Sequence, residues 1–207
     1  MTERDTANLE AIVLAAGASA RFGGAKLLAR LDGAPLVAGA LLTAFLSPVR
    51  RVHVAVAGDA VRKVVRATAE RLAASDRLTI VTVEDAAEGM GASLRAAARA
   101  LPDDAVGTFV FLGDMPRIDP ATVTTLARVL TSPHDIVAPT YLGRRGHPVL
   151  FGASWFPALR ALSGDEGARV LLETAGARLT RVAVEDPGIH LDVDRPEDLA
   201  RAVEGRA

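Results

Sequence analysis

Short apolar runs rich in Val, Ile and Phe alternate along the chain with longer stretches in which apolar residues recur every three or four positions. Runs of the first kind predict buried strands, and the spacing of the second kind predicts helices with one apolar face. Strands are predicted at residues 11–14, 52–57, 78–83, 108–112 and 136–139, and helices at residues 35–45, 60–74, 90–100 and 120–130. Asp119 is placed to cap the last of these helices. This rhythm predicts an α/β fold with a mostly parallel, doubly wound sheet.

The segment at residues 140–149 interrupts the alternation. Its glycines and Pro148 indicate a loop, which we expect to lead into a short strand at 148–151 and a helix at 157–162. Further helices are expected at 168–174 and from residue 195 onward. Because no linker or internal repeat divides the chain, we expect a polar N-terminal extension at 1–10 and a single domain at 11–203.

Composition narrows the function classes. Half of the 207 residues are hydrophobic but only 4% are aromatic, which suits a core of Ala, Val and Leu around a buried parallel sheet. A net charge of -1 gives no electrostatic basis for binding nucleic acid or a membrane surface. The absence of Cys excludes disulfides, thiolate metal sites and Cys nucleophiles. With no secretory signal and no apolar run long enough to span a bilayer, a cytoplasmic protein is expected.

The first predicted strand runs into a loop of small residues that ends at Lys26. Small side chains around Gly17 let backbone N–H groups close around phosphate oxygens, and Lys26 supplies a cation with little expected packing role. Leu27 follows Lys26 where a Walker ATPase has Ser or Thr, and the Gly spacing of a Rossmann dehydrogenase is missing, so both classes are disfavoured. A plain tight turn with a surface lysine remains the alternative.

Carboxylates follow two other segments. Asp114 comes directly after an apolar strand, where a carboxylate opposite a phosphate loop suits Mg²⁺ bound to nucleotide phosphates. The alternative for Asp114 is a cap on the following turn. Asp192 and Asp194 lie on one side of the chain if this segment is extended, so one of them could complete the metal site. For Asp194, a cap on the last helix is equally consistent with the sequence.

The loop before the helix at 90–100 contains Gly89, Gly91 and Ser93. Two glycines let a flat base or ribose approach the backbone, and Ser93 offers a hydroxyl near the start of the helix. An ordinary helix entry explains the same pattern.

A compact basic loop at Arg144, Arg145 and His147 suits a phosphate-bearing acceptor, although a solvated basic turn explains it as well. His147 is an acid or base candidate, but a structural histidine before a proline is the more common case. Gly164 and Gly167 then flank two acidic residues at the entry to the helix at 168–174.

Taken together and in this order, the motifs resemble the MobA-like nucleotidyltransferase family, whose opening signature is close to LAAGxSxRFGxxK. The chain matches that signature in full at residues 14–26. Its later motifs, GMGASL, GDMP, RGHPVLF, GDEGAR and DVDRPEDL, are similar to those of the branch that makes molybdopterin cytosine dinucleotide.

This resemblance implies a Rossmann-like, three-layer αβα fold and transfer of CMP from CTP to a molybdopterin-type phosphorylated acceptor, with Mg²⁺ as cofactor and loss of pyrophosphate. A molybdoenzyme would receive the product. The implied nucleotide-binding residues are Leu14, Ala15, Ala16, Gly17, Arg21, Lys26, Gly89, Ser93 and Asp114. Among these, Arg21, Lys26 and Asp114 would carry catalysis. The implied Mg²⁺ ligands are Asp114 and Asp192, and the basic loop at Arg145, Gly146 and His147 would bind the acceptor.

Two positions bear on specificity. Relatives that use cytosine most often have Gln where this chain has Met115, which leaves the acceptor and base open. The guanine-using branch has Gly where this chain has Ser93, which favours CTP. The alternatives are a nucleotidyltransferase for another acceptor, such as methylerythritol phosphate or a sugar phosphate, and a non-catalytic cofactor chaperone.

Overall fold

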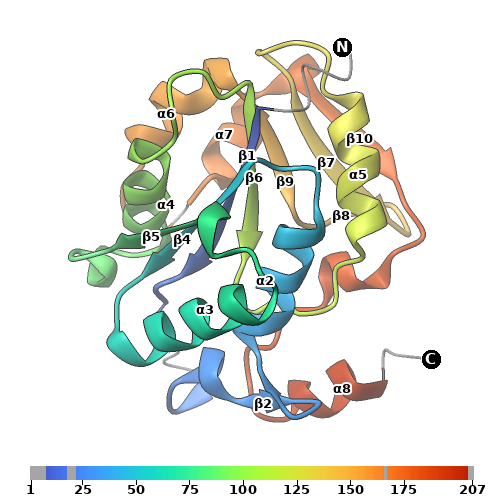
Figure 1. The fold of residues 1–207 in the computed structure, drawn as a ribbon. Helices are drawn as coiled ribbons and strands as arrows, with labels where there is room; N and C mark the ends of the chain where they lie inside the picture. The colour runs from blue at the N-terminus through green and yellow to red at the C-terminus, as the bar shows by residue number, and fades with distance from the viewer. Residues whose placement is uncertain (1–7, 18–21, 166, 205–207) are drawn as a thin grey trace.

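The computed structural model describes residues 8–17, 22–165 and 167–204, and its centre is an eight-stranded, mostly parallel sheet (Figure 1). Seven strands follow the order β10-β7-β9-β6-β1-β4-β5, and β8 pairs with β7. Their bounds are β1 Leu9–Ala15, β4 Arg51–Val56, β5 Leu78–Thr82, β6 Gly107–Leu112, β7 Ile136–Tyr141, β8 Arg144–Arg145, β9 Val149–Gly152 and β10 Leu179–Ala183. β1 pairs in parallel with β4 and β6, whereas β9 runs antiparallel between β6 and β7. The predicted α/β fold is confirmed.

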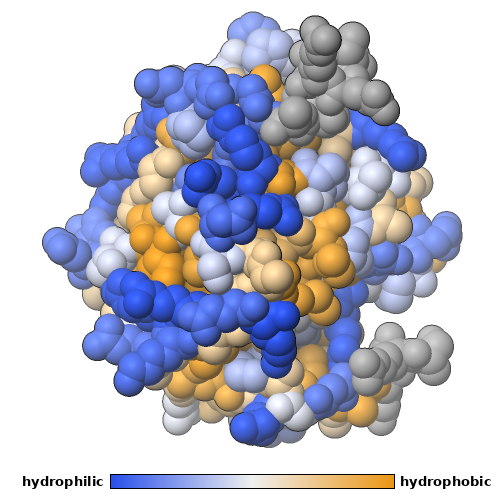
Figure 2. Space-filling model, in the orientation of Figure 1, coloured by the Kyte–Doolittle hydropathy of each residue, from blue (hydrophilic) through white to orange (hydrophobic). Residues whose placement is uncertain are grey.

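Helices cover both faces of the sheet (Figure 1). One group is α2 Val37–Leu46, α3 Asp59–Arg71 and α5 Pro120–Val129, and the other is α4 Met90–Arg99, α6 Phe156–Arg160 and α7 Arg169–Thr174. On the face shown in Figure 2, hydrophilic side chains form much of the rim, and apolar patches lie toward the middle. Asp119 caps α5 as expected, since its Oδ1 accepts a hydrogen bond from the Ala121 N–H at 2.8 Å.

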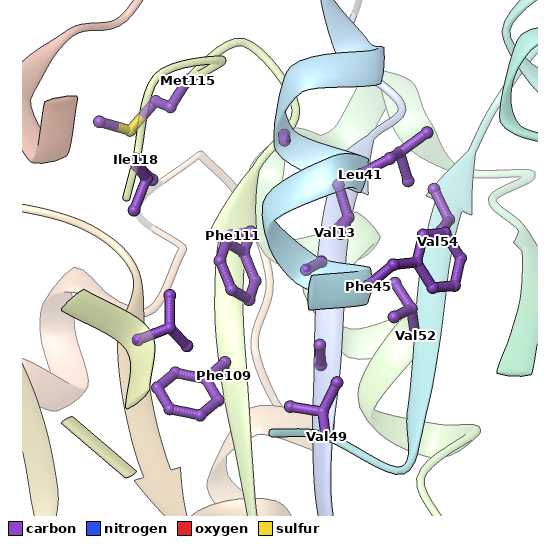
Figure 3. Packing of buried hydrophobic residues seen from close by; sticks show 14 of the residues in the cluster. Val13, Leu41, Phe45, Val49, Val52, Val54, Phe109, Phe111, Met115 and Ile118 are labelled. Carbon is purple, nitrogen blue, oxygen red and sulfur yellow. The ribbon is translucent and has the colours of Figure 1, made fainter. Parts of the chain in front are cut away.

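Two hydrophobic cores follow from the alternation of side chains along the strands. In β1, Val13 packs in the core with α2, α3 and α5, and its neighbour Ile12 packs in the core with α4, α6 and α7. Figure 3 shows the first core, where Phe45 of α2 lies against Val52 and Val54 of β4. This two-sided burial explains why the strands are nearly continuous apolar runs.

The folded part begins earlier than the expected boundary at residue 11. β1 starts at Leu9, and both Leu9 and Glu10 are fully buried, so they do not belong to a polar extension at 1–10. The Glu10 carboxylate accepts a 2.7 Å hydrogen bond from Arg50 Nε, and His53 Nε2 lies 3.0 Å from its other oxygen. A carboxylate with such partners can be buried, although its charge suggests an exposed residue when only the sequence is known.

Four short strands were not predicted, and one of them, β8, lies in the segment at 140–149 that was expected to be a loop. β10 is an edge strand with mostly exposed or half-buried side chains, so its sequence lacks an apolar run. The hairpin of β2 Arg30–Leu31 and β3 Ala34–Pro35 is too short to give a period-two pattern. It lies beside α8 Asp198–Glu204 at the lower edge in Figure 1, and Leu31, Leu36, Val193 and Ala202 form a small separate core there.

None of the helices in the described ranges is both long and apolar enough to cross a bilayer.

Candidate nucleotide-binding site

A cavity of about 530 Å³, the first cavity, lies where the chain leaves the carboxyl ends of β1 and β6. Ligands of parallel α/β sheets bind at this edge. Seven residues predicted to bind the nucleotide line it: Leu14, Ala16, Gly17, Lys26, Gly89, Ser93 and Asp114. Tertiary structure thus brings together three motifs that are far apart in the sequence.

Two predicted nucleotide residues are not among them. The Ala15 side chain is buried in the core and borders a neighbouring third cavity of about 500 Å³, so only its backbone is available to a ligand. Arg21 lies outside the described residues, and its role stays a prediction.

Lys26 is held between two carboxylates. Its Nζ donates hydrogen bonds to Asp114 Oδ2 at 2.7 Å and to Asp194 Oδ1 at 3.0 Å. Burial by itself lowers the pKa of Lys26, but these two carboxylates outweigh it and raise the pKa above its ordinary value. Lys26 is only 8% exposed, so the expectation of a lysine with little packing role is wrong. It is a cation that lines the first cavity and is held by two hydrogen bonds.

Asp114 has one oxygen left over. While Oδ2 accepts the hydrogen bond from Lys26, the buried Oδ1 has no hydrogen-bond partner in the described part of the chain. Gly113 brings this carboxylate close to the first loop, since its N–H donates to the Leu14 carbonyl at 2.9 Å and a Cβ would lie 2.8 Å from that oxygen. A buried, unpaired carboxylate oxygen is a suitable ligand for a cation.

The two C-terminal aspartates differ in their contacts. Asp194 reaches Lys26, whereas the cap at this turn comes from Asp198, whose Oδ2 accepts hydrogen bonds from the N–H groups of Asp194 and Arg195. Burial raises the pKa of Asp192, and the negative charges of Asp194 and Asp114 raise it further. All three carboxylates therefore belong to one acidic region around Lys26. Among the described residues, no three His, Cys, Asp or Glu side chains form a metal-binding group of their own.

The glycines of the third motif accommodate another part of the chain. The Gly91 N–H donates to the Gly164 carbonyl at 2.8 Å, and a Cβ on Gly91 would lie 2.6 Å from the Ser163 carbonyl oxygen. Gly89 adopts a φ of 114°, and a Cβ there would lie 2.8 Å from Gly164 carbonyl atoms. The glycines thus let the segment at 163–165 pack on the loop, a contact that the sequence analysis did not foresee.

A second cavity of about 280 Å³ adjoins the first, and the two share Leu14, Met90, Leu112 and Asp165. The residues predicted to bind the acceptor, Arg145, Gly146 and His147, all line it. Gly146 packs under Ile189, where a Cβ would lie 2.6 Å from the Ile189 Cγ1. Arg145 is exposed and contributes positive charge at this cavity.

His147 is half-buried in this loop, between the buried Gly146 and the buried Pro148. Burial lowers its pKa, and a hydrogen bond to the backbone of Val110 and the charge of Asp114 oppose this shift only in part. Its Nδ1 has no hydrogen-bond partner within the described residues. At neutral pH a lowered pKa favours the uncharged imidazole.

A model of the MobA-like NTP transferase domain matches residues 11–182. The chain belongs to this family. The family and the fold make it a nucleotidyltransferase that uses a nucleoside triphosphate, as the motifs indicated.

Proteins that are about 30% identical to this chain support this assignment. The purine catabolism protein PucB of Bacillus subtilis (strain 168) is 32% identical over 199 residues, which cover 90% of this chain and 92% of PucB. The structure of a Mycobacterium tuberculosis rv0371c homologue from Mycobacterium sp. strain JC1 is 30% identical, with a TM-score of 0.80 over 96% of both chains. Rv0371c of M. tuberculosis H37Rv, in complex with manganese, is 30% identical with a TM-score of 0.74, covering 95% of this chain and 98% of that one.

Two structural features in and near the site were not predicted from the sequence. Asp165 borders both cavities, although only its glycine-flanked motif was noted. Arg117, which follows the GDMP motif, holds the hairpin and α8 by pairing with Asp32 and donating from Nε to the Ala202 carbonyl at 2.9 Å. Contacts between such distant segments leave no signal in a single sequence.

Proposed function

We propose that the protein transfers a CMP moiety from CTP to a molybdopterin-type phosphorylated acceptor and releases pyrophosphate. The observation that carries the proposal is the pairing of Lys26 with Asp114 and Asp194. Lys26 and Asp114 line the first cavity, and this cavity adjoins a second one bordered by Arg145. One cavity would hold the nucleotide and the other the acceptor, so that the reacting phosphates meet at their shared wall.

The residues of the chain would act by position and charge. An acceptor phosphate oxygen would attack the α-phosphorus of CTP while the bond from this phosphorus to the bridging oxygen of pyrophosphate breaks. Lys26 and Arg21 would hold the phosphates and stabilise the negative charge that develops on them. Because the pKa of Lys26 is raised, this cation persists through the neutral range. No covalent enzyme intermediate is needed.

A divalent cation fits the carboxylates. The unpaired Asp114 Oδ1 is a free oxygen ligand, and Asp192 or Asp194 would be the second. Mg²⁺ in such a site neutralises phosphate charge and needs only one or two carboxylates besides phosphate oxygens and water. The manganese complex of the relative Rv0371c supports a divalent cation in this family.

Cytosine is the proposed base. Ser93 is buried and lines the first cavity, where its hydroxyl would contribute a hydrogen bond near the base. The resemblance associates a serine at this position with CTP rather than GTP. Met115, which departs from the cytosine-using pattern, is buried in the core on the α2 side of the sheet and does not line the first cavity.

The decisive experiment measures pyrophosphate release from each of the four NTPs with Mg²⁺ and molybdopterin. We expect release with CTP that depends on the acceptor, and a covalent dinucleotide product by mass spectrometry. Release with methylerythritol phosphate or a sugar phosphate instead would show that the protein serves another acceptor. Ligand-induced thermal stabilisation without any pyrophosphate would identify a cofactor-binding chaperone.

A further inference from the structure

Asp165 stands on the wall between the two cavities. Its side chain lines both of them, and it is exposed to solvent. In the described part of the chain it makes no hydrogen bond or ion pair, unlike Asp114 and Asp194, which hold Lys26. A free carboxylate at this place is available to a ligand.

The fold fixes the backbone that carries this carboxylate. The bond from the Gly91 N–H to the Gly164 carbonyl ties the preceding residue to the start of α4. Side chains at positions 89 and 91 would collide with the segment at 163–165, so only glycines permit this close packing. Two motifs more than 70 positions apart therefore cooperate to place Asp165 over the loop before α4.

The residues that line the second cavity favour one type of ligand. Most of its walls are apolar: Leu94, Val110, Leu112, Val149, Phe151 and Leu172. A sugar or polyol in such a cavity would lose water from several hydroxyls without gaining partners, which is costly. A flat aromatic ring fits apolar walls and needs polar partners only at its edge.

Asp165 is the only carboxylate among the residues that line the second cavity in the described structure, and it accepts hydrogen bonds when ionised. Two adjacent N–H groups on a ring edge match the two oxygens of a carboxylate. Arg145 and Arg169, which also line the cavity, suit the anionic arm of the same ligand.

We propose that Asp165 determines acceptor specificity by accepting hydrogen bonds from adjacent N–H groups of a planar heteroaromatic ring, of the 2-amino-4-oxopteridine class, bound in the second cavity. The inference rests on the proposed function for the location of the acceptor. It adds the residue that distinguishes such a ring from a sugar phosphate.

Binding of 6-hydroxymethylpterin, followed by the fluorescence of the pterin, tests this without any chemistry. The variants are D165A and D165N, and D103N is the matched control, since Asp103 is exposed near the opposite end of β6. We expect Kd to rise about 10- to 100-fold in D165A, the range for losing a hydrogen bond to a charged group, and less in D165N. D103N should bind as the wild type does. Absence of pterin binding by the wild type, or equal binding by all variants, would overturn the proposal.

Steady-state kinetics with CTP and molybdopterin separate this role from a structural one. We expect the KM for the acceptor to rise in both Asp165 variants, with less than about twofold change in the KM for CTP. A rise in the KM for CTP alone would place Asp165 on the nucleotide and overturn the proposal.

The two proposals fail differently. Pterin binding that depends on Asp165, without pyrophosphate release from any NTP, would refute the transferase function and leave the inference standing. Acceptor-dependent pyrophosphate release with unchanged kinetics in D165A would refute the inference and leave the function standing.

Discussion

The Nζ of Lys26 donates a 2.7 Å hydrogen bond to Oδ2 of Asp114, and these two residues are 88 positions apart. The bond joins the loop after β1 to the turn after β6, which are neighbouring parallel strands. The bond restrains both side chains, and Lys26 is buried. The other carboxylate oxygen of Asp114 stays unpaired among the described residues. The contact turns two separate motifs into one charged site.

Replacing Lys26 by methionine should abolish the fixed cation and keep the length of the side chain. We expect kcat/KM for CTP to fall at least about 100-fold, the scale of losing one preorganised electrostatic group. Asp114 and Asp194 would then repel each other without a counter-charge, so the Tm should fall as well. The control is K63M, because Lys63 is the other lysine of the chain and lies exposed on α3. Unchanged kinetics in K26M would remove Lys26 from the phosphate site.

Asp114→Asn should weaken the response to the divalent cation. The variant keeps the shape of the side chain but removes the negative charge that a cation requires, so turnover should fall about 100-fold or more. Titration of Mg²⁺ and Mn²⁺ in the pyrophosphate assay gives the apparent cation affinity. Asp103→Asn again serves as control. Wild-type cation dependence in the Asp114 variant would mean that another group binds the metal.

Asp192→Asn and Asp194→Asn should differ in their effect on stability at neutral pH. The raised pKa of Asp192 means that its ionised form is disfavoured in the folded protein, so D192N should raise the Tm. This gain should shrink as the pH falls and vanish below the ordinary value of 3.8, where Asp192 is protonated in both states. D194N removes a partner of Lys26 and should not stabilise. A Tm difference for D192N that does not change with pH would contradict this explanation.

Gly91→Ala should disturb the wall between the cavities. Its Cβ would lie 2.6 Å from the backbone of Ser163, so either α4 or the segment at 163–165 must shift. Overpacking of this kind costs about 1–3 kcal/mol. We expect a lower free energy of unfolding in urea and a higher KM for the acceptor. Gly58→Ala is the control, since a Cβ on Gly58 meets no atom within 4 Å. Equal stability of the two variants would contradict the predicted clash.

Arg117→Ala should release the hairpin and α8 from the sheet. The side chain pairs with Asp32 and with the Ala202 carbonyl, so its loss should raise hydrogen exchange in both segments. Activity should fall too, because the chain that leads to α8 carries Asp192 and Asp194. The control is Arg128→Ala on the exposed side of α5. If exchange stays at wild-type rates in α8, Arg117 is not its anchor.

The sequence by itself determined the alternation of strands and helices, the family and the motifs of the site. Buried strands such as β1 and β6 are continuous apolar runs, and the loops after them carry Gly17, Lys26 and Asp114, so local composition suffices. Edge strand β10 was not predicted, because its side chains are largely exposed and do not form an apolar run.

Tertiary structure alone decided which of these residues meet. Asp194 contacts Lys26, and the segment at 163–165 packs on Gly89 and Gly91. Both contacts depend on how distant loops come together at one edge of the sheet. Hydrophobic periodicity specifies which face of an element is buried, but it does not specify the partner of a charged side chain at a loop. The place of Asp165 between the two cavities follows only from that packing.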